Sequence, residues 1–282
     1  MANADLAAPA TCRRAADEFD GWSVGAPTVD SMKFRLKSLA DRLTAALLLL
    51  PALPLIGLLV LAIRLTSRGP AVYRQTRVGK GGRIFTMYKL RSMRMDAEAA
   101  TGPVWAGLSS DSRVTPLGYW LRRLHLDELP QLFNVLSGEM SLVGPRPERP
   151  EFVKVLADQV DGYLDRLGVL PGITGLAQIN LPPDTDLESV RRKLVLDCEY
   201  IRTSSLFLDL RIVACTALRV FGLRGGRAVQ LLGLHRKVAR ASADTSAELT
   251  HGHVTPHYAT SSSHVLVISR PHAQEALRST EA

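Results

Sequence analysis

The sequence lacks the cysteines that a disulfide-stapled fold needs. Its 282 residues include three cysteines, Cys12, Cys198 and Cys215, which lie far apart and form no CxxC motif. An odd number of well-separated cysteines provides no disulfide framework and none of the usual zinc signatures. We therefore expect a protein of a reducing compartment. Hydrophobic residues make up 46% of the chain, which is enough for one sizeable core with room for tails.

Both ends of the sequence lack apolar patterning. Residues 1–30 are rich in alanine and contain no apolar segment of the kind found in secretory signals. From about residue 225 the chain becomes polar and rich in Ser and Thr, and it holds six of the seven histidines at irregular spacing. We predict disordered tails over 1–30 and 225–282, with weak metal affinity at most in the second. No internal repeat is visible.

Acidic residues are nearly absent from 33–94. Thirteen Lys and Arg side chains in this stretch stand against one acid, Asp41, a local excess of +12 in a chain whose net charge is +8. Such a block predicts a polyanionic partner, which could be nucleic acid, anionic lipid or a phosphorylated substrate. A long apolar run interrupts the block, however, so a water-facing nucleic-acid surface is disfavoured.

That run covers residues 43–63, LTAALLLLPALPLIGLLVLAI, and carries no charge over 21 residues. Its length is sufficient to cross a bilayer. Pro51 and Pro54 lie in its middle, where each removes a backbone donor and favours a kink. Both flanks are basic, and basic flanks prefer the cytoplasmic side. The pattern favours a re-entrant membrane helix within 31–68, while a true span and a buried core helix remain alternatives.

The segment after the membrane helix reads as a mixed α and β domain. AVYRQTRVG and RIFTMYKLRSM, joined by GKGG, predict a short β-hairpin, because the glycines match a tight turn and not the GxxxxGK[ST] phosphate loop. Helical spacing recurs in 148–167, 186–203 and 204–222, with the last helix placed in the core or at the membrane interface. Residues 171–184 look turn-rich. We predict an α+β, mainly helical domain over 69–224.

The stretch LDELPQLFNVLSGEMSLVGPRP, residues 126–147, admits two interpretations. In the first, Asp127 caps an ordinary core helix that stops at Gly138. In the second, Asp127 and Glu128 join two arginines in a site for an anion, because Arg122 lies about one helical turn earlier and Arg146 sits between two prolines. Carboxylates bind Mg²⁺, guanidiniums clamp phosphate oxygens, and a carboxylate can attack phosphorus to form an acyl phosphate. Beside a membrane helix, this combination suits phosphoryl transfer at a bilayer surface.

Several motifs in order resemble one known family. They are KFRLKSLADRL before the proline-containing helix, SRGPAVYRQTRVGKGGRIFTMYKLRSM, LDELPQLFNVLSGEMSLVGPRP, PGITGLAQIN and DCEYIRTSSLFLDLRI. Over about residues 33–221 the chain resembles the bacterial sugar transferase family, the monotopic polyprenyl-phosphate phosphoglycosyl transferases. The resemblance implies transfer of a sugar 1-phosphate from a UDP-sugar to undecaprenyl phosphate, with release of UMP and a covalent phosphosugar-aspartyl intermediate. It also implies a place at the inner face of the bacterial cytoplasmic membrane and a role in starting polysaccharide or glycoconjugate assembly.

The resemblance also assigns roles to individual residues. Asp127 matches the nucleophile, and Glu128 matches the second carboxylate, with both near Mg²⁺. The residues expected at the substrate phosphates are Arg122, Arg146, Lys89 and Arg91. Pro54, with Pro51 beside it, matches the break in the membrane helix. The implied partners are a UDP-sugar, undecaprenyl phosphate and anionic membrane lipids, without nucleic acid and with a homo-oligomer left open.

The sequence departs from the family pattern at two places. Leu53 precedes Pro54 where a serine is usual, so a carbonyl freed by the kink loses a local hydroxyl partner. Leu181-Pro182-Pro183 follows PGITGLAQIN where Gly-Arg is common, which removes one cation and affects donor preference. An inactive membrane-attached scaffold is the alternative function. The identity of the sugar is not readable from these motifs.

Overall fold

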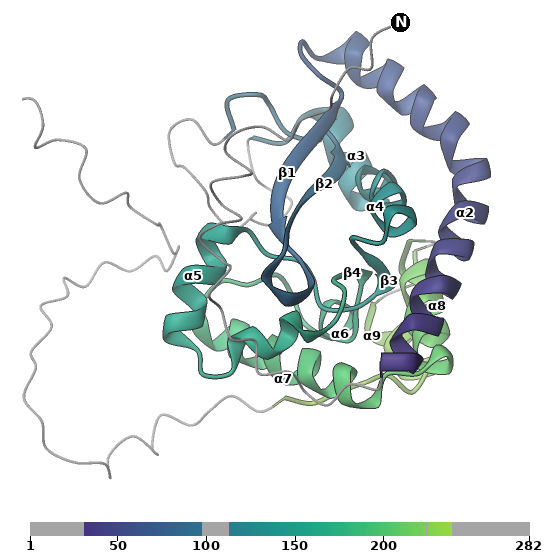
Figure 1. Ribbon diagram of the computed structural model, residues 1–282. Helices are drawn as coiled ribbons and strands as arrows, with labels where there is room; N and C mark the ends of the chain where they lie inside the picture. Colours follow the sequence, from purple (N-terminus) through teal and green to yellow (C-terminus); the bar gives the residue numbers. More distant parts are fainter. Residues whose placement is uncertain (1–30, 98–112, 221, 224, 239–282) are drawn as a thin grey trace, which may run out of the picture.

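A computed structural model describes residues 31–97, 113–220, 222–223 and 225–238 (Figure 1). The tail predicted over 1–30 and the greater part of the tail predicted over 225–282 lie outside the described residues. Figure 1 shows a small group of strands at the centre, with helices around it and the long helix α2 along one side. The described part is mainly helical with two short two-stranded sheets, which confirms the α+β, mainly helical class.

Helix α2, Ser31–Thr66, lies on the surface of this body. One of its faces is buried, with Ala45, Leu49 and Ala52 at most 6% exposed, at the three- and four-residue spacing of a helix face. Its other face is exposed leucine, including Leu47 at 67% and Leu50 at 68%. A core helix would bury both faces, so the core-helix alternative is wrong. An apolar face of this size needs a non-aqueous neighbour.

Pro51 and Pro54 both lie inside α2, and the helix continues through them. The prolines therefore do not interrupt the helix as predicted. Figure 1 instead shows α2 curving around one side of the body. A helix can absorb a missing donor by bending while the rest of its hydrogen-bond ladder persists. Among the described residues, α2 is the one helix long and apolar enough to cross a membrane, so it could span or insert in one.

The predicted β-hairpin is confirmed. Strands β1, Val72–Val78, and β2, Ile84–Leu90, pair antiparallel with Val72 opposite Leu90 and Val78 opposite Ile84. The one-turn helix η1, Lys80–Gly82, connects them, and Gly81 and Gly82 have φ values of +65° and +79°. Glycine accepts these left-handed values without steric cost, so GKGG is a turn and not a phosphate loop.

The remaining elements are short. They are α3 (Pro116–Arg123), η2 (Leu126–Glu128), α4 (Gln131–Ser137), β3 (Ser141–Val143), α5 (Pro150–Gln159), η3 (Tyr163–Gly168), β4 (Gly172–Thr174), α6 (Leu176–Asn180), α7 (Leu187–Thr203), α8 (Leu206–Val220) and α9 (Gly225–Leu231). The helices predicted within 148–167, 186–203 and 204–222 are thus present as α5 with η3, α7 and α8. Asp186 begins α7 by accepting a hydrogen bond from the backbone of Ser189.

The stretch 171–184 is more regular than its turn-rich composition suggests. It contains β4 and α6, and β4 pairs in parallel with β3 through Ser141 opposite Gly172 and Val143 opposite Thr174. A Cβ atom on Gly172 would lie 2.1 Å from the backbone nitrogen of Gly144. This glycine therefore permits a close approach of two backbones. In the sequence, a glycine needed for such a long-range contact looks the same as a glycine needed for a turn.

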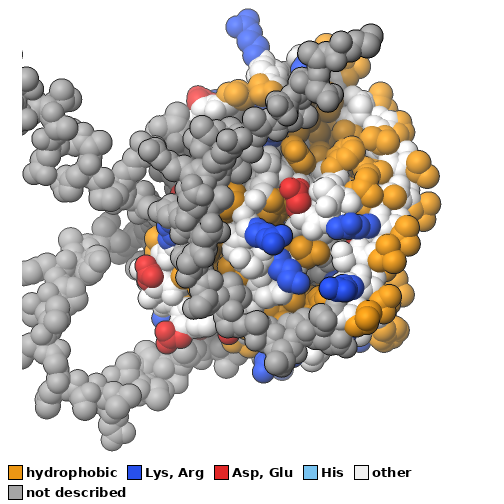
Figure 2. Space-filling view, viewed as in Figure 1, with side chains coloured by type: hydrophobic (Ala, Val, Ile, Leu, Met, Phe, Trp, Pro, Cys, Tyr) orange, Lys and Arg blue, Asp and Glu red, His pale blue; other side chains and the backbone are white. Residues whose placement is uncertain are grey.

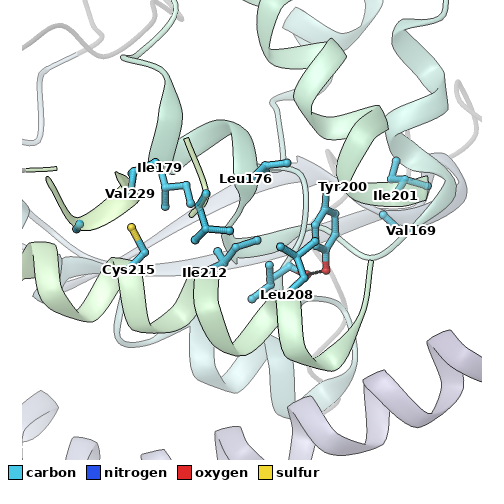
Figure 3. Packing of buried hydrophobic residues seen from close by; sticks show 12 residues of the cluster. Val169, Leu176, Ile179, Tyr200, Ile201, Leu208, Ile212, Cys215 and Val229 are labelled. Atoms are coloured by element: carbon cyan, nitrogen blue, oxygen red, sulfur yellow. Dashed lines mark hydrogen bonds between the residues drawn. The ribbon is translucent and has the colours of Figure 1, made fainter. Parts of the chain in front are cut away.

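The boundary predicted at residue 225 is wrong. Helix α9 lies beyond it and buries Ala228 and Val229, and Leu234 after it is completely buried. These side chains complete a core formed largely by α6, α7 and α8 (Figure 3). Helix α8 contributes Ile212 and Cys215 to that core and exposes Phe207. The buried face of α8 supports the core alternative predicted for 204–222, and the membrane-interface alternative stays a prediction.

A buried polar cluster fastens the start of α2 to the body. Lys37 Nζ lies 2.9 Å from Asp41 Oδ2 and 2.9 Å from Asp209 Oδ2 in α8. The Ser141 hydroxyl donates to the same Asp41 oxygen at 2.6 Å, and the Tyr200 hydroxyl donates to Asp209 Oδ1 at 2.7 Å. One ammonium group thus forms ion pairs with two buried carboxylates from different helices.

Replacing Lys37 should therefore destabilise the fold. Lys37→Met leaves Asp41 and Asp209 buried without their cation, and such a loss costs about 3–5 kcal/mol. The free energy of unfolding, measured by urea titration in detergent, should fall by that amount. Arg35→Met, at an exposed position two residues earlier, should change it by less than about 0.5 kcal/mol. Equal effects of the two substitutions would contradict the role of Lys37.

Candidate active site

Asp127 and Glu128 lie in the one-turn helix η2, between α3 and α4. Helix α3 begins at Pro116 with a Thr115 cap and ends near Leu124, and His125 then adopts a left-handed φ of +54°. This reversal directs the two carboxylates inward, and Asp127 is 8% exposed. The elements on both sides therefore hold the pair in a buried turn.

The capping role predicted for Asp127 is wrong. Helix α4 begins at Gln131, and its N-cap residue is Pro130, which makes no side-chain hydrogen bond. Asp127 belongs to the separate turn before it. The predicted stop is confirmed, because Gly138 ends α4 with a φ of +82°. With capping removed, local helix structure no longer explains why a carboxylate is buried at position 127.

Glu128 is held by two cations. Its Oε1 atom accepts a hydrogen bond from Arg146 at 2.8 Å and from Lys89 at 3.2 Å. Burial alone would raise the pKa of Glu128, but the charges of Arg146 and Lys89 outweigh burial and hold it below the ordinary glutamate value. Glu128 is therefore ionised throughout the neutral range.

Asp127 is in the opposite situation. Burial and the neighbouring charge of Glu128 raise its pKa, and the nearby cations Lys89, Arg122 and Arg146 oppose that rise only in part. Within the part of the chain that the structure describes, Asp127 makes no hydrogen bond or ion pair. A pair of adjacent carboxylates with pKa values driven apart is a common sign of divided chemical roles. Here Glu128 is the fixed anion, and Asp127 is the one left available.

The sequence prediction placed four cations at this site, and three lie near the carboxylates. Lys89 in β2 and Arg146 after β3 contact Glu128 directly, and Arg122 at the end of α3 is close enough to lower the pKa of Asp127. Arg91 differs. Its guanidinium donates to Ser67 O at 2.9 Å and to Arg68 O at 2.8 Å, so it closes the end of α2. The predicted phosphate contact of Arg91 is not supported by these contacts.

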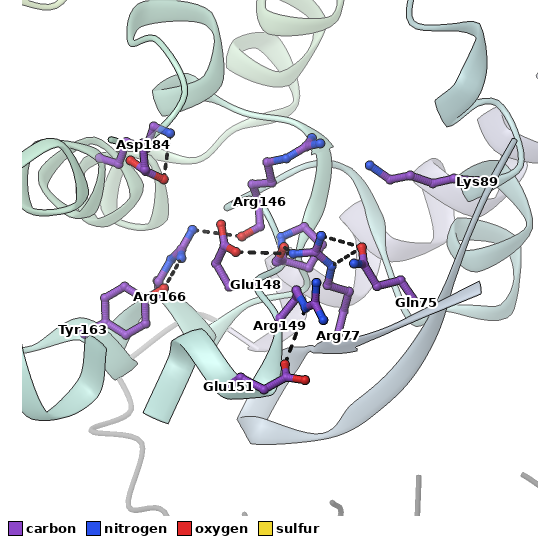
Figure 4. Close-up of polar contacts among 12 residues, drawn as sticks. Gln75, Arg77, Lys89, Arg146, Glu148, Arg149, Glu151, Tyr163, Arg166 and Asp184 are labelled. Carbon is purple, nitrogen blue, oxygen red and sulfur yellow. Dashed lines mark hydrogen bonds and ion pairs between the residues drawn. The ribbon is translucent and has the colours of Figure 1, made fainter. Parts of the chain in front are cut away.

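Two residues that support Arg146 were missed. Arg166 donates to the backbone oxygen of Arg146 at 2.9 Å and to the Tyr163 hydroxyl at 2.8 Å (Figure 4). Asp197 holds the same guanidinium at 2.8 Å. Asp197 lies in the quoted motif DCEYIRT, but a motif does not show which distant carbonyl an ion pair supports. Arg166 is thus a positioning residue for the loop of Arg146.

The two carboxylates fit Mg²⁺ only together with a substrate. Among the described residues, no group of three or more His, Cys, Asp or Glu side chains could hold a metal ion. Mg²⁺ commonly takes one or two protein carboxylates and completes its shell with phosphate oxygens and water. Asp127 has no protein partner among the described residues, and Glu128 bonds its two cations through Oε1, which leaves carboxylate oxygens for such an ion.

The face that holds this site combines charge and apolar surface. Figure 2 shows Lys and Arg side chains gathered near its centre and apolar side chains over the side where α2 lies. Trp120 of α3 is 54% exposed and Phe133 of α4 is 40% exposed, so apolar surface also borders the carboxylate turn. A ligand with an anionic group and a long apolar chain would match both parts.

Comparisons with known proteins agree with this arrangement. The chain is 41% identical over 188 residues to a UDP-glucose:undecaprenyl-phosphate glucose-1-phosphate transferase of Xanthomonas campestris pv. campestris, covering 66% of this chain and 39% of that protein. It is 44% identical over 183 residues to a protein of the same name from Caulobacter vibrioides (64% and 67% covered). It is also 44% identical over 180 residues to a UDP-N-acetylgalactosamine-undecaprenyl-phosphate N-acetylgalactosaminephosphotransferase of Aeromonas hydrophila (61% and 42% covered).

The matched region coincides with the described fold. The Xanthomonas protein is much longer, and this chain's match spans about two fifths of its length. A family model for bacterial sugar transferases matches residues 32–223, from the start of α2 to the end of α8 and beyond. This match covers more than half of the chain and includes the carboxylate turn and its cations. The chain therefore belongs to the bacterial sugar transferase family.

Proposed function

We propose that this protein transfers a sugar 1-phosphate from a UDP-sugar to undecaprenyl phosphate and releases UMP. The observation that carries the proposal is the division of roles between Asp127 and Glu128, in which a buried carboxylate without a protein partner among the described residues lies beside one held by two cations. The names of the relatives describe this reaction with glucose or N-acetylgalactosamine as the sugar. Membership of the family makes an inactive scaffold the weaker alternative, because the carboxylates and three cations are in place.

The proposed reaction has two displacements at one phosphorus. An Asp127 carboxylate oxygen attacks the phosphorus that bears the sugar, and the bond from that phosphorus to the oxygen of UMP breaks, so that UMP leaves. A phosphate oxygen of undecaprenyl phosphate then attacks the same phosphorus and displaces the Asp127 carboxylate. The product is a lipid diphosphate sugar, and Asp127 is restored. Dividing one transfer into two steps lets a single nucleophile serve donor and acceptor in turn.

The surrounding side chains have separate tasks in this scheme. Arg146, whose side chain is 39% exposed, presents its remaining donors to the diphosphate while it holds Glu128. Lys89 and Arg122 add positive charge near the oxygens that become more negative in the transition state. Asp127 and Glu128 would hold Mg²⁺, which when bound neutralises the diphosphate of the donor.

The membrane part of the proposal concerns α2. Its exposed leucines insert into the cytoplasmic membrane, and its basic flanks keep both ends on the cytoplasmic side as a re-entrant helix. The carboxylate turn then faces the cytoplasm, where nucleotide sugars are soluble, beside a bilayer that holds undecaprenyl phosphate. Anionic lipids pair with the basic flanks. The product is the first lipid-linked sugar of a polysaccharide or glycoconjugate.

Asp127→Asn should abolish the reaction, because an amide does not attack phosphorus. UMP release by membrane-reconstituted protein with Mg²⁺ and a panel of UDP-sugars should fall by at least about 1,000-fold, as for other lost nucleophiles. Intact-mass spectrometry should show a phosphosugar adduct on the unsubstituted protein and none on the variant. Asp161→Asn, at an exposed position, is the matched control and should retain activity. A phosphosugar adduct on the Asp127→Asn variant, or lipid binding without UMP release from any donor, would contradict the proposal.

The acidic limb of the pH profile should depend on the charges around Asp127. Protonation removes the nucleophile, so adduct formation is lost as pH falls through the pKa of Asp127, which lies above the ordinary aspartate value. Glu128→Gln removes a charge that raises this pKa and should move the limb to lower pH. Arg122→Gln removes a charge that lowers it and should move the limb to higher pH. Single-turnover rates against pH would measure both, and shifts in the same direction would contradict this account.

The re-entrant topology predicts that both ends of α2 are reached from one side. Cysteine placed at exposed Lys33 and at exposed Arg68, in a chain whose native cysteines are replaced, should react with a membrane-impermeant maleimide in inverted vesicles. Neither position should react in right-side-out vesicles. A simple span would leave the two cysteines labelled from opposite sides.

A further inference from the structure

A small cavity lies behind Arg146, on the side away from Lys89 (Figure 4). Its volume is about 30 Å³, and a single water needs about 10–15 Å³ by this measure. The wall includes Arg146, Glu148, Tyr163 and Arg166, with residues of α5, α6, α7 and the loop between α6 and α7. The cavity therefore has space for one or two polar groups, within one arginine side chain of the carboxylate turn.

Two residues that line this cavity each carry a buried acceptor atom without a partner. They are Oε1 of Gln178 in α6 and Oδ1 of Asp184 in the following loop, and both lack a hydrogen bond to any described residue. The other oxygen of Asp184 is held by Lys193 of α7 at 2.9 Å, which fixes the carboxylate in place. Burial raises the pKa of Asp184, and the charge and hydrogen bond of Lys193 oppose that rise. Buried acceptors normally have hydrogen-bond partners. Two acceptors without partners on residues of one cavity wall therefore point to an absent donor group.

The chemistry of this cavity fits a hydroxyl group better than a nucleobase. Two unpaired acceptors call for donors, and a sugar ring carries several hydroxyl donors, whereas uracil presents two carbonyl oxygens and a single N–H. The cavity is also too small for a pyrimidine ring, and its aromatic wall residue, Tyr163, is already covered by the guanidinium of Arg166 at 5.2 Å. No lining ring is therefore left to stack on a base.

We infer that Gln178 and Asp184 form a subsite that accepts a hydroxyl or hydroxymethyl substituent of the donor's sugar. This inference rests on the proposed function, because the sugar is joined to the phosphate that Arg146 binds. Asp184 and Gln178 are then specificity-determining residues, which select among UDP-sugars by the position of one hydroxyl. A site built to bond a hydroxyl discriminates strongly against a donor that lacks it, since its own acceptors would stay buried and unpaired.

The test compares deoxy analogues across variants. The probes are the UDP-sugar that gives the fastest UMP release and its four monodeoxy analogues. With the unsubstituted protein, one analogue should lose about 10–100-fold in kcat/KM, the cost of leaving an acceptor unpaired. Asp184→Asn presents an amide donor to the cavity, and Gln178→Met removes the acceptor. Both variants should lower kcat/KM for the parent sugar and reduce that analogue's penalty to within about threefold.

Three controls make the outcomes decisive. The melting temperature of each variant shows that the fold persists, and Asp161→Asn should leave every ratio unchanged. The inhibition constant of UMP should stay within about twofold, because UMP lacks the transferred sugar that the subsite is inferred to bind. A rise in that constant equal to the rise in KM would assign the cavity to the nucleotide and overturn the inference. Unchanged analogue penalties in both variants would also overturn it, whereas absence of UMP release from the unsubstituted protein would overturn the proposed function itself.

Discussion

The ion pair between Glu128 and Arg146, with Lys89 as its second cation, is the interaction on which the rest of the site depends. Two adjacent carboxylates buried in one turn repel each other, so at least one must be neutralised. The hairpin delivers Lys89 from β2, and the loop after β3 delivers Arg146. Because both cations bond Glu128, Asp127 stays without a partner among the described residues. The fold thereby produces one ion-paired carboxylate and one available carboxylate from neighbouring positions in the chain.

That arrangement needs a rigid support, and the support comes from distant segments. The backbone of Arg146 is held by Arg166, which Asp197 fixes in turn, while β3 pairs with β4 through the close contact at Gly144 and Gly172. On the other side of β3, Ser141 joins the cluster of Lys37 and Asp41 in α2. The strand that leads to the active-site loop is therefore tied to the helix with the large apolar surface. The position of the carboxylate turn relative to α2 is therefore set by packed structure.

The sequence predicted the features that depend on local chemistry. The GKGG turn, the stop at Gly138 and the apolar run of α2 all follow from backbone preference or periodicity, and all are present. The structure places Arg146 in contact with Glu128, next to Asp127, and the catalytic roles of these residues stay predictions. What failed depended on contacts over long separations. Arg91 donates to backbone oxygens at the end of α2, and Asp127 lies in its own turn instead of capping α4. The folded part also extends past residue 225, since α9 fills a gap that exists only in three dimensions.

Helix α2 shows why periodicity alone could not decide how the chain responds to its two prolines. A proline removes one hydrogen bond, and the sequence does not show whether the helix responds by breaking or by bending. Here α2 is continuous through Pro51 and Pro54 and follows the curved side of the body, with Ala45, Leu49 and Ala52 packed inward. Small residues on that face allow close approach, whereas leucines on the opposite face keep a continuous apolar surface. The prolines are therefore compatible with a helix that bends along the folded domain and keeps a uniformly apolar outer face.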